Sequence, residues 1–211
     1  MAFTSTPFTM LPIRPRCEVS AGFCLLCLWF AWAAGWEMLG AVLLSAAVHE
    51  LGHLLVLWAA GARVRGVRVG VLGAVMEADT ARLSYVWELG AVLAGPLANL
   101  LFAAALIPAG AEALIGANIV LCCFNLLPLP PLDGGRALRL GLSWALGPDR
   151  GEAISSGVGT LSALALSAFL IYLMAGTGGS LWLLPSCAAS AALAVKKEKI
   201  RESFCKKCLH S

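Results

Sequence analysis

The sequence predicts an all-α polytopic membrane protein with about six transmembrane helices and a short β-like segment at the cytoplasmic face. Of its 211 residues, 60% are hydrophobic and 13% are charged, whereas about a quarter of the residues in a soluble domain are charged. The mean hydropathy is +0.85. Several apolar stretches approach or exceed the roughly 20 residues that a helix needs to cross a bilayer. We therefore expect a single membrane-embedded domain over residues 1–211.

The first apolar stretch, residues 18–60, is too long for one membrane-spanning helix. At about 1.5 Å per residue, such a helix would be about twice as long as the bilayer core is thick. The chain should therefore turn at Gly35, Trp36 and Glu37. The predicted spans cover about 19–36, 38–60, 87–108, 112–128, 154–174 and 180–195.

The basic residues predict the orientation of these spans. All fifteen Lys and Arg lie in four segments, residues 1–18, 61–86, 129–153 and 196–211. Six spans place these segments on one side of the membrane, and Lys and Arg favour the cytoplasmic side. We expect a multi-pass cell-membrane protein with both termini cytoplasmic, including a basic tail over 196–211. The N-terminus lacks the basic region of a cleavable signal peptide, so the first span should be retained. The net charge of +3 thus indicates topology and not nucleic-acid binding.

The segment 61–86 has a different pattern from the spans. Five Val residues between 64 and 75 are interleaved with Arg and Gly. β-branched residues broken by glycine favour one or two short strands near the inner membrane surface. A plain basic loop is the alternative.

The motif His49-Glu50-Leu51-Gly52-His53 lies within the second predicted span. On a helix, the two imidazoles share one face and can bind one Zn²⁺, while the adjacent Glu can take a proton from water. Ionisable residues inside a membrane helix usually mark a functional site. The alternative, a polar contact between helices, explains neither the spacing of the imidazoles nor Glu50.

A catalytic zinc commonly has a third protein ligand. The only other histidine, His210, lies in the tail, so the third ligand should be a carboxylate or a thiolate. Asp133 is the best candidate, because the predicted topology brings it to the depth of His49 and His53. The alternative for Asp133 is a turn residue before two glycines. None of the eight cysteines suggests a disulfide framework, and Cys205, Cys208 and His210 form at best a weak metal site.

Three segments in this order resemble the site-2 protease family of intramembrane zinc metalloproteases. They are the motif at residues 49–53, Ala94-Gly95-Pro96-Leu97-Ala98-Asn99, and the stretch from Asn125 to Arg136 that ends in the family's NxxPxxPLDGGR pattern. The resemblance covers about 42–139 and implies a three-helix catalytic core, which we place at about 38–139. It implies one Zn²⁺ held by His49, His53 and Asp133, Glu50 as the catalytic carboxylate, and Asn125 as a substrate-binding residue. Structural or supporting roles are expected for Asn99, Gly95, Pro96 and Gly134.

The resemblance is strongest to the small bacterial branch that contains a sporulation protease acting on a pro-sigma factor. It implies hydrolysis of a peptide bond in a membrane-associated or transmembrane protein, near the cytoplasmic side. The expected partners are that substrate, regulatory membrane proteins and the lipid bilayer. The chain departs from the branch because only about sixteen residues follow the last predicted span, too few for a nucleotide-sensing CBS domain. The alternative function is a non-catalytic membrane scaffold or metal-binding protein on the same fold.

Overall fold

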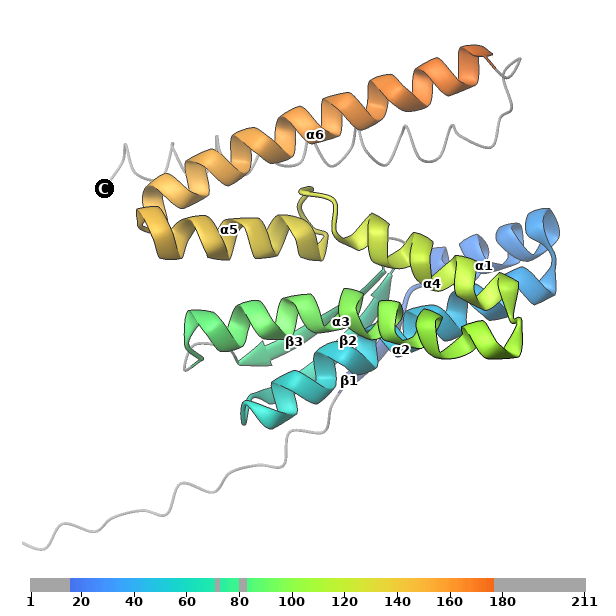
Figure 1. Ribbon diagram of the computed structural model, residues 1–211, viewed down its shortest axis with the longest axis horizontal. Helices are drawn as coiled ribbons and strands as arrows, with labels where there is room; N and C mark the ends of the chain where they lie inside the picture. The colour runs from blue at the N-terminus through green and yellow to red at the C-terminus, as the bar shows by residue number, and fades with distance from the viewer. Residues whose placement is uncertain (1–15, 71–72, 80–82, 177–211) are drawn as a thin grey trace, which may run out of the picture.

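The computed structural model describes residues 16–70, 73–79 and 83–176, and it is mostly helical (Figure 1). In chain order, its elements are β1 (Arg16–Val19), α1 (Ala21–Ala34), α2 (Trp36–Ala59), β2 (Arg63–Gly70), β3 (Gly73–Asp79), α3 (Tyr85–Leu106), the 3-10 turn η1 (Ile107–Ala109), α4 (Glu112–Asn125), α5 (Asp133–Leu146) and α6 (Pro148–Gly176). The helices α1 and α2 meet at Gly35, so the chain turns where the sequence predicts.

Three helical segments of the described part are long and apolar enough to cross a membrane. They are α2, α3 continued through η1, and residues 148–169 of α6. The helices α1 and α4 are also apolar, but each has only 14 residues. The remaining predicted span, about 180–195, lies outside the described residues. Three candidate spans are therefore found, and the six-span topology stays a prediction.

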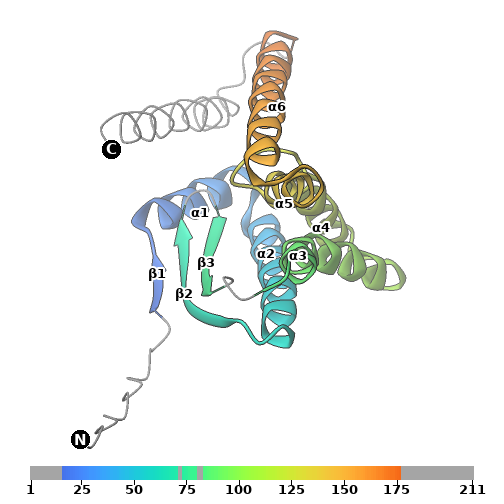
Figure 2. The same cartoon turned by 90° about the vertical axis from the view of Figure 1, so that its left-hand side faces the viewer.

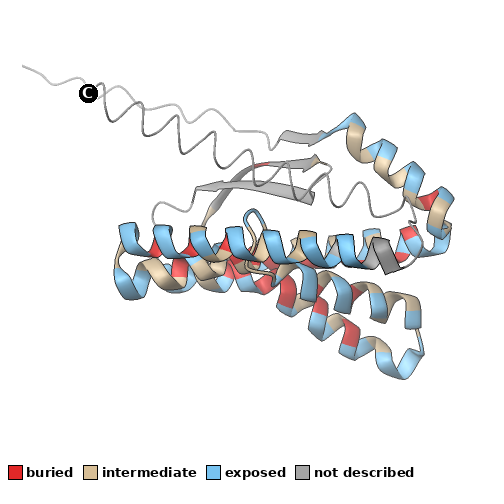
Figure 3. Ribbon diagram, turned by 90° about the horizontal axis from the view of Figure 1, so that it is seen from above, coloured by how far each residue is buried: buried red, intermediate tan, exposed pale blue. Residues whose placement is uncertain are grey.

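The helices α2 and α3 pack against each other and present apolar side chains outward. Large exposed residues of α2 include Leu51, Leu55 and Trp58, and exposed positions cover the outer faces of the helices in Figure 3. The buried residues face the neighbouring helices. Such helices, apolar on every side, suit a lipid environment. Small residues between them, such as Ala91 and Ala94, allow the close approach that is common between membrane helices.

A three-stranded sheet in the order β1-β2-β3 lies beside the helices (Figure 2). The strand β2 pairs with β1 in parallel and with β3 in antiparallel orientation. The strands β2 and β3 occupy the stretch where the sequence analysis expects one or two short strands. The strand β1 is not expected, because its four residues are too few for an alternating pattern to be distinctive and its partner lies far along the chain.

The helix α5 is also not expected, because the sequence analysis treats 129–153 only as a segment between spans. It contains basic residues, Arg136 and Arg139, as well as a buried Leu140. Such charges are not typical of a membrane span, although the apolar residues of this segment recur at helical spacing. The helix lies between α3 and α6 in Figure 1 and packs against both. The following helix α6 begins at Pro148, earlier than the predicted start near 154.

Candidate metal centre

The two histidines of the motif lie on the buried face of α2. His49 has 5% of its surface exposed and His53 has 9%. They are four residues apart, so their side chains stack one turn apart on the same side of the helix. The helix α3 covers this face. A polar pair at such a position needs partners, since buried polar groups without hydrogen bonds are costly.

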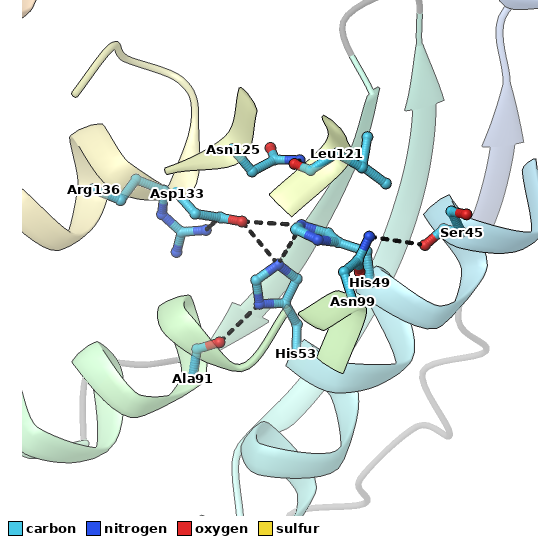
Figure 4. A network of polar contacts seen from close by, with 9 residues as sticks. All are labelled: Ser45, His49, His53, Ala91, Asn99, Leu121, Asn125, Asp133 and Arg136. Atoms are coloured by element: carbon cyan, nitrogen blue, oxygen red, sulfur yellow. Dashed lines mark hydrogen bonds and ion pairs between the residues drawn. The ribbon is translucent and has the colours of Figure 1, made fainter. Parts of the chain in front are cut away.

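Asp133 meets both imidazoles at the start of α5 (Figure 4). Its Oδ2 lies 3.0 Å from His49 Nε2 and 3.2 Å from His53 Nε2. The two Nε2 atoms are 3.1 Å apart. Ligands about 2.0 to 2.2 Å from one tetrahedral zinc lie about 3.3 to 3.6 Å from each other. Two nitrogens and one oxygen with nearly this spacing form a group that can bind one metal ion.

A backbone contact orients His53. Its Nδ1 lies 2.7 Å from the carbonyl oxygen of Ala91 on α3. A carbonyl only accepts hydrogen bonds, so Nδ1 carries the proton and donates it. The Nε2 atom, which faces His49 and Asp133, is then the ring nitrogen left to bind a metal. Metal-binding histidines commonly have such a partner on the other nitrogen.

The absence of a side chain at Gly95 leaves space for the imidazoles. A Cβ atom at this position would lie 2.8 Å from His49 Nε2 and 2.6 Å from His53 Cε1, closer than real contacts. Pro96 follows within α3. The sequence analysis expects Gly95 to have a supporting role in helix packing. In the structure, its closest neighbours are the two imidazoles themselves.

The loop between α4 and α5 places Asp133. The next residue, Gly134, is in such close contact with the carbonyl groups of Leu126 and Leu127 that a Cβ atom would clash with them. On the other side of the loop, Gly159 of α6 lies against Pro130, and its Cβ would approach Pro130 Cδ to 2.9 Å. Sequence reasoning misses Gly159, because an isolated glycine in an apolar helix is not specific. The helix α6 thus supports the loop that carries the third candidate ligand.

Asp133 is ionised at neutral pH. Burial opposes its charge, but the contacts with the His49 and His53 imidazoles outweigh burial and lower the pKa of its carboxyl to about 2. Arg136 Nη1 lies 4.0 Å from the other carboxylate oxygen, Oδ1. A carboxylate binds metal in its ionised form, so Asp133 is in the state that a metal ligand requires.

Glu50 and Asn125 lie beside this group. Glu50 directly follows His49 on α2 and is half-buried, and its carboxylate does not belong to the three-residue group. Asn125 ends α4, where its Nδ2 donates a hydrogen bond to the carbonyl of Leu121 at 3.0 Å. Figure 4 shows its side chain next to the site. The roles of Glu50 in catalysis and of Asn125 in substrate binding stay predictions.

A second polar group lies next to His49. Asn99 donates from Nδ2 to the carbonyl of Ser45, at 3.4 Å, and Asn118 of α4 donates from Nδ2 to Ser45 Oγ, at 2.8 Å. A supporting role for Asn99 is expected from the sequence, whereas roles for Asn118 and Ser45 are not. The available signal is that each of these residues is a polar one within an apolar helix, which does not show that the three side chains meet. The tail residues Cys205, Cys208 and His210 lie outside the described residues.

The chain is similar to known proteins both in sequence and in fold. Residues 111–166 match the profile of "Peptidase family M50". The fold is similar to that of "Site-2 Protease from Methanocaldococcus jannaschii", with a TM-score of 0.63 and 22% sequence identity over 87% of this chain and 89% of that chain. Residues 111–166 thus carry the peptidase family M50 pattern, and the chain has a fold similar to that of a site-2 protease.

Curated relatives of the chain carry zinc metalloprotease names. Rip3 of Mycobacterium tuberculosis (strain H37Rv), provisionally named a zinc metalloprotease, is 30% identical over 207 residues, which cover 86% of this chain and 49% of Rip3. "Zinc metalloprotease MJ0392" of Methanocaldococcus jannaschii is 29% identical over 147 residues, which cover 64% of this chain and 43% of that protein. The chain thus spans less than half the length of these two relatives.

Proposed function

We propose that the chain is an intramembrane zinc metalloprotease that hydrolyses a peptide bond in a membrane-associated or transmembrane protein. The convergence of His49, His53 and Asp133 on one point, with Glu50 beside them, carries this proposal. Two of these ligand candidates and Glu50 belong to a helix that is apolar enough to span a membrane. The names of the curated relatives support zinc as the metal.

In the proposed reaction, His49, His53 and Asp133 hold the metal. Bound Zn²⁺ supplies Lewis acidity toward a water molecule and toward the carbonyl of the scissile bond. Glu50 accepts a proton from the attacking water and delivers it to the leaving amine. Asn125 hydrogen-bonds the substrate backbone and holds it in place. The substrate must be locally extended, because a helix engages its own carbonyl groups in hydrogen bonds.

We further propose that the cut lies near the cytoplasmic side of a six-span protein with both termini cytoplasmic. The one-sided distribution of all fifteen Lys and Arg supports this orientation. Candidate substrates are regulatory precursors held at the inner membrane surface, such as a pro-sigma factor, and regulatory membrane proteins are candidate partners.

The strand β3 offers a binding edge for an extended substrate. It is the last strand in the order β1-β2-β3, so among the described residues one of its edges has no partner strand. In Figure 2, β3 is the strand nearest to α2 and α3. An unpaired edge can bind a peptide through main-chain hydrogen bonds. We propose that substrate pairs with β3 and that its scissile bond then reaches Glu50.

The proposal is tested by co-expressing candidate membrane-associated precursors with the wild-type chain or with Glu50→Gln. The amide cannot accept the proton of the attacking water, so the variant should lose cleavage. It should still bind zinc, because Glu50 is not one of the three ligand candidates. Residual cleavage within about tenfold of wild type would exclude Glu50 as the base. Zinc binding without cleavage of any precursor by the wild-type chain would favour the alternative, a metal-binding scaffold.

A further inference from the structure

Three buried polar atoms near the metal centre have no hydrogen-bond partner. They are His49 Nδ1, Asn99 Oδ1 and Asn118 Oδ1, and within the described part of the chain they are the only buried side-chain nitrogen or oxygen atoms without one. Asn99 and Asn118 are fully buried. A buried polar atom left unpaired is costly. Asn99 and Asn118 both bond to Ser45, which lies four residues before His49 on α2, so the three residues with unpaired atoms are grouped around Ser45 and call for a further partner.

The packing of α2 against α3 brings Asn99 close to His49. His53 contacts Ala91, His49 lies against Gly95, and Ser45 contacts Asn99. The contacts thus advance four residues at a time in opposite directions, so the two helices are antiparallel. Side chains on a helix lean toward its N-terminus. His49 therefore leans toward the level of Ser45, while Asn99, which starts at that level, leans toward His49 (Figure 4).

The orientation of both amides follows from their partners. Asn99 Nδ2 faces the carbonyl of Ser45 at 3.4 Å, and Asn118 Nδ2 faces the carbonyl of Leu114 at 2.8 Å. Carbonyl oxygens only accept hydrogen bonds, so in each amide the nitrogen must occupy this position. The Ser45 hydroxyl donates to the carbonyl of Ala41 and accepts from Asn118. Both Oδ1 atoms are therefore left as acceptors that need a donor.

We propose that one buried water accepts a hydrogen bond from His49 Nδ1–H and donates its two protons to Asn99 Oδ1 and Asn118 Oδ1. When Nε2 binds a metal, neutral His49 carries its proton on Nδ1. The three unpaired atoms are then one donor and two acceptors, which a single water can satisfy with three hydrogen bonds by accepting one and donating both of its protons. In this proposal His49 is oriented by three positioning residues, Asn99, Asn118 and Ser45. They hold its imidazole through the water, as the carbonyl of Ala91 holds the imidazole of His53.

The inference rests on the proposed metal site, and its test is made on zinc affinity rather than on cleavage. Replacing Asn99 or Asn118 by Leu removes an acceptor at similar volume. Loss of a partner behind a metal-binding histidine typically lowers metal affinity about 10- to 100-fold. Zinc affinity of the detergent-purified full chain is measured by competition with a chelator, and helix content is measured alongside. Ser155→Ala, which changes a buried serine on α6, is the control and should leave the affinity unchanged.

Asn118→Asp separates positioning from packing. As a neutral acid it keeps the carbonyl acceptor and replaces the two N–H donors, which bond to Ser45 and Leu114, with one O–H donor. Zinc affinity should therefore stay within about threefold of wild type, unlike in Asn118→Leu. Equal losses in the two variants would indicate a packing role and overturn the inference, as would wild-type affinity in both Leu variants. No zinc binding by the wild-type chain would instead overturn the metal site itself.

A measurement on the wild-type chain covers the case in which the Leu variants do not fold. With ¹⁵N-labelled histidine and zinc bound, the NMR signal of His49 Nδ1–H should show transfer to a slowly exchanging water. An unprotonated Nδ1, or a protonated one without a water contact, would contradict the proposal.

Discussion

Gly95 shows how single residues limit what the centre can accommodate. The imidazoles of His49 and His53 lie where a side chain at this position would be. The three ligand candidates could be predicted from sequence, since the spacing of the two histidines and the scarcity of other ligands restrict the choice. The neighbours of His49 could not be predicted, because Asn118 and Ser45 acquire their roles only when three helices pack together. The contact from His53 to the backbone of Ala91 leaves no trace in the sequence either.

We predict that Gly95→Ala displaces one or both imidazoles and lowers zinc affinity and cleavage. Overpacking of this kind costs about 1 to 3 kcal/mol, and a displacement of about 1 Å at a reacting centre can reduce the rate about 100-fold. Gly90→Ala on the same helix is the matched control, because its Cβ would meet no atom within 4 Å. Zinc affinity and cleavage should both be measured. Equal behaviour of the two variants would show that Gly95 has no special role.

Among the secondary-structure elements, α6 contacts the loop that leads to Asp133 although it carries none of the three candidate ligands. The apolar runs predict α2 and α3 well, because membrane spans leave long unbroken patterns in a sequence. They do not predict α5, whose charges interrupt the apolar run, or β1, whose pairing with β2 is long-range. The contact between α6 and the loop at Pro130 depends on how α5 packs against α6. No motif in the sequence indicates this packing.

We predict that Gly159→Val shifts the loop around Pro130 and weakens metal binding through Asp133. The branched side chain would overlap the proline ring, which already lies in close contact. Gly157→Val on the same helix should retain zinc, since nothing lies within 4 Å of a Cβ there. Metal analysis after dialysis compares the two variants. Full zinc retention by Gly159→Val would separate α6 from the site.

The edge of β3 gives a prediction about substrate binding. Proline substitutions are suited to test this edge only if they lie in β3. Proline at Val67 or Val69 would disrupt the sheet itself, because these residues lie in β2, the middle strand. Adjacent residues of a strand direct their amides to opposite edges. Proline should therefore be placed at Val75 and at Met76 in separate variants. One of the two removes an amide from the free edge, and the other removes an amide from the pairing with β2. At least one variant should cut cleavage strongly while zinc stays bound. Unchanged cleavage in both, or crosslinkers at 73–79 that never capture substrate while those near 125 do, would rule out strand pairing.

For the molecule as a whole, orientation in the membrane decides which side supplies the substrate. We predict cytoplasmic N- and C-termini and an external position for residues near 110, because the inner segments hold all fifteen Lys and Arg. Reporter fusions at these three places test the arrangement. The C-terminal fusion is the most informative, because three of the six predicted spans are not among the candidate spans of the described helices and the side of the C-terminus depends on the total number of spans. An external C-terminus would refute the six-span topology.

The central claim is that His49, His53 and Asp133 together hold one zinc ion. Metal analysis of detergent-purified protein tests it most directly, by comparing the wild-type chain with Asp133→Ala. The wild-type chain should contain about one zinc per chain, and the variant should lose most of it, because two histidines alone bind the metal weakly. Full zinc stoichiometry with unchanged affinity in Asp133→Ala would contradict the claim and point to another third ligand, such as a cysteine.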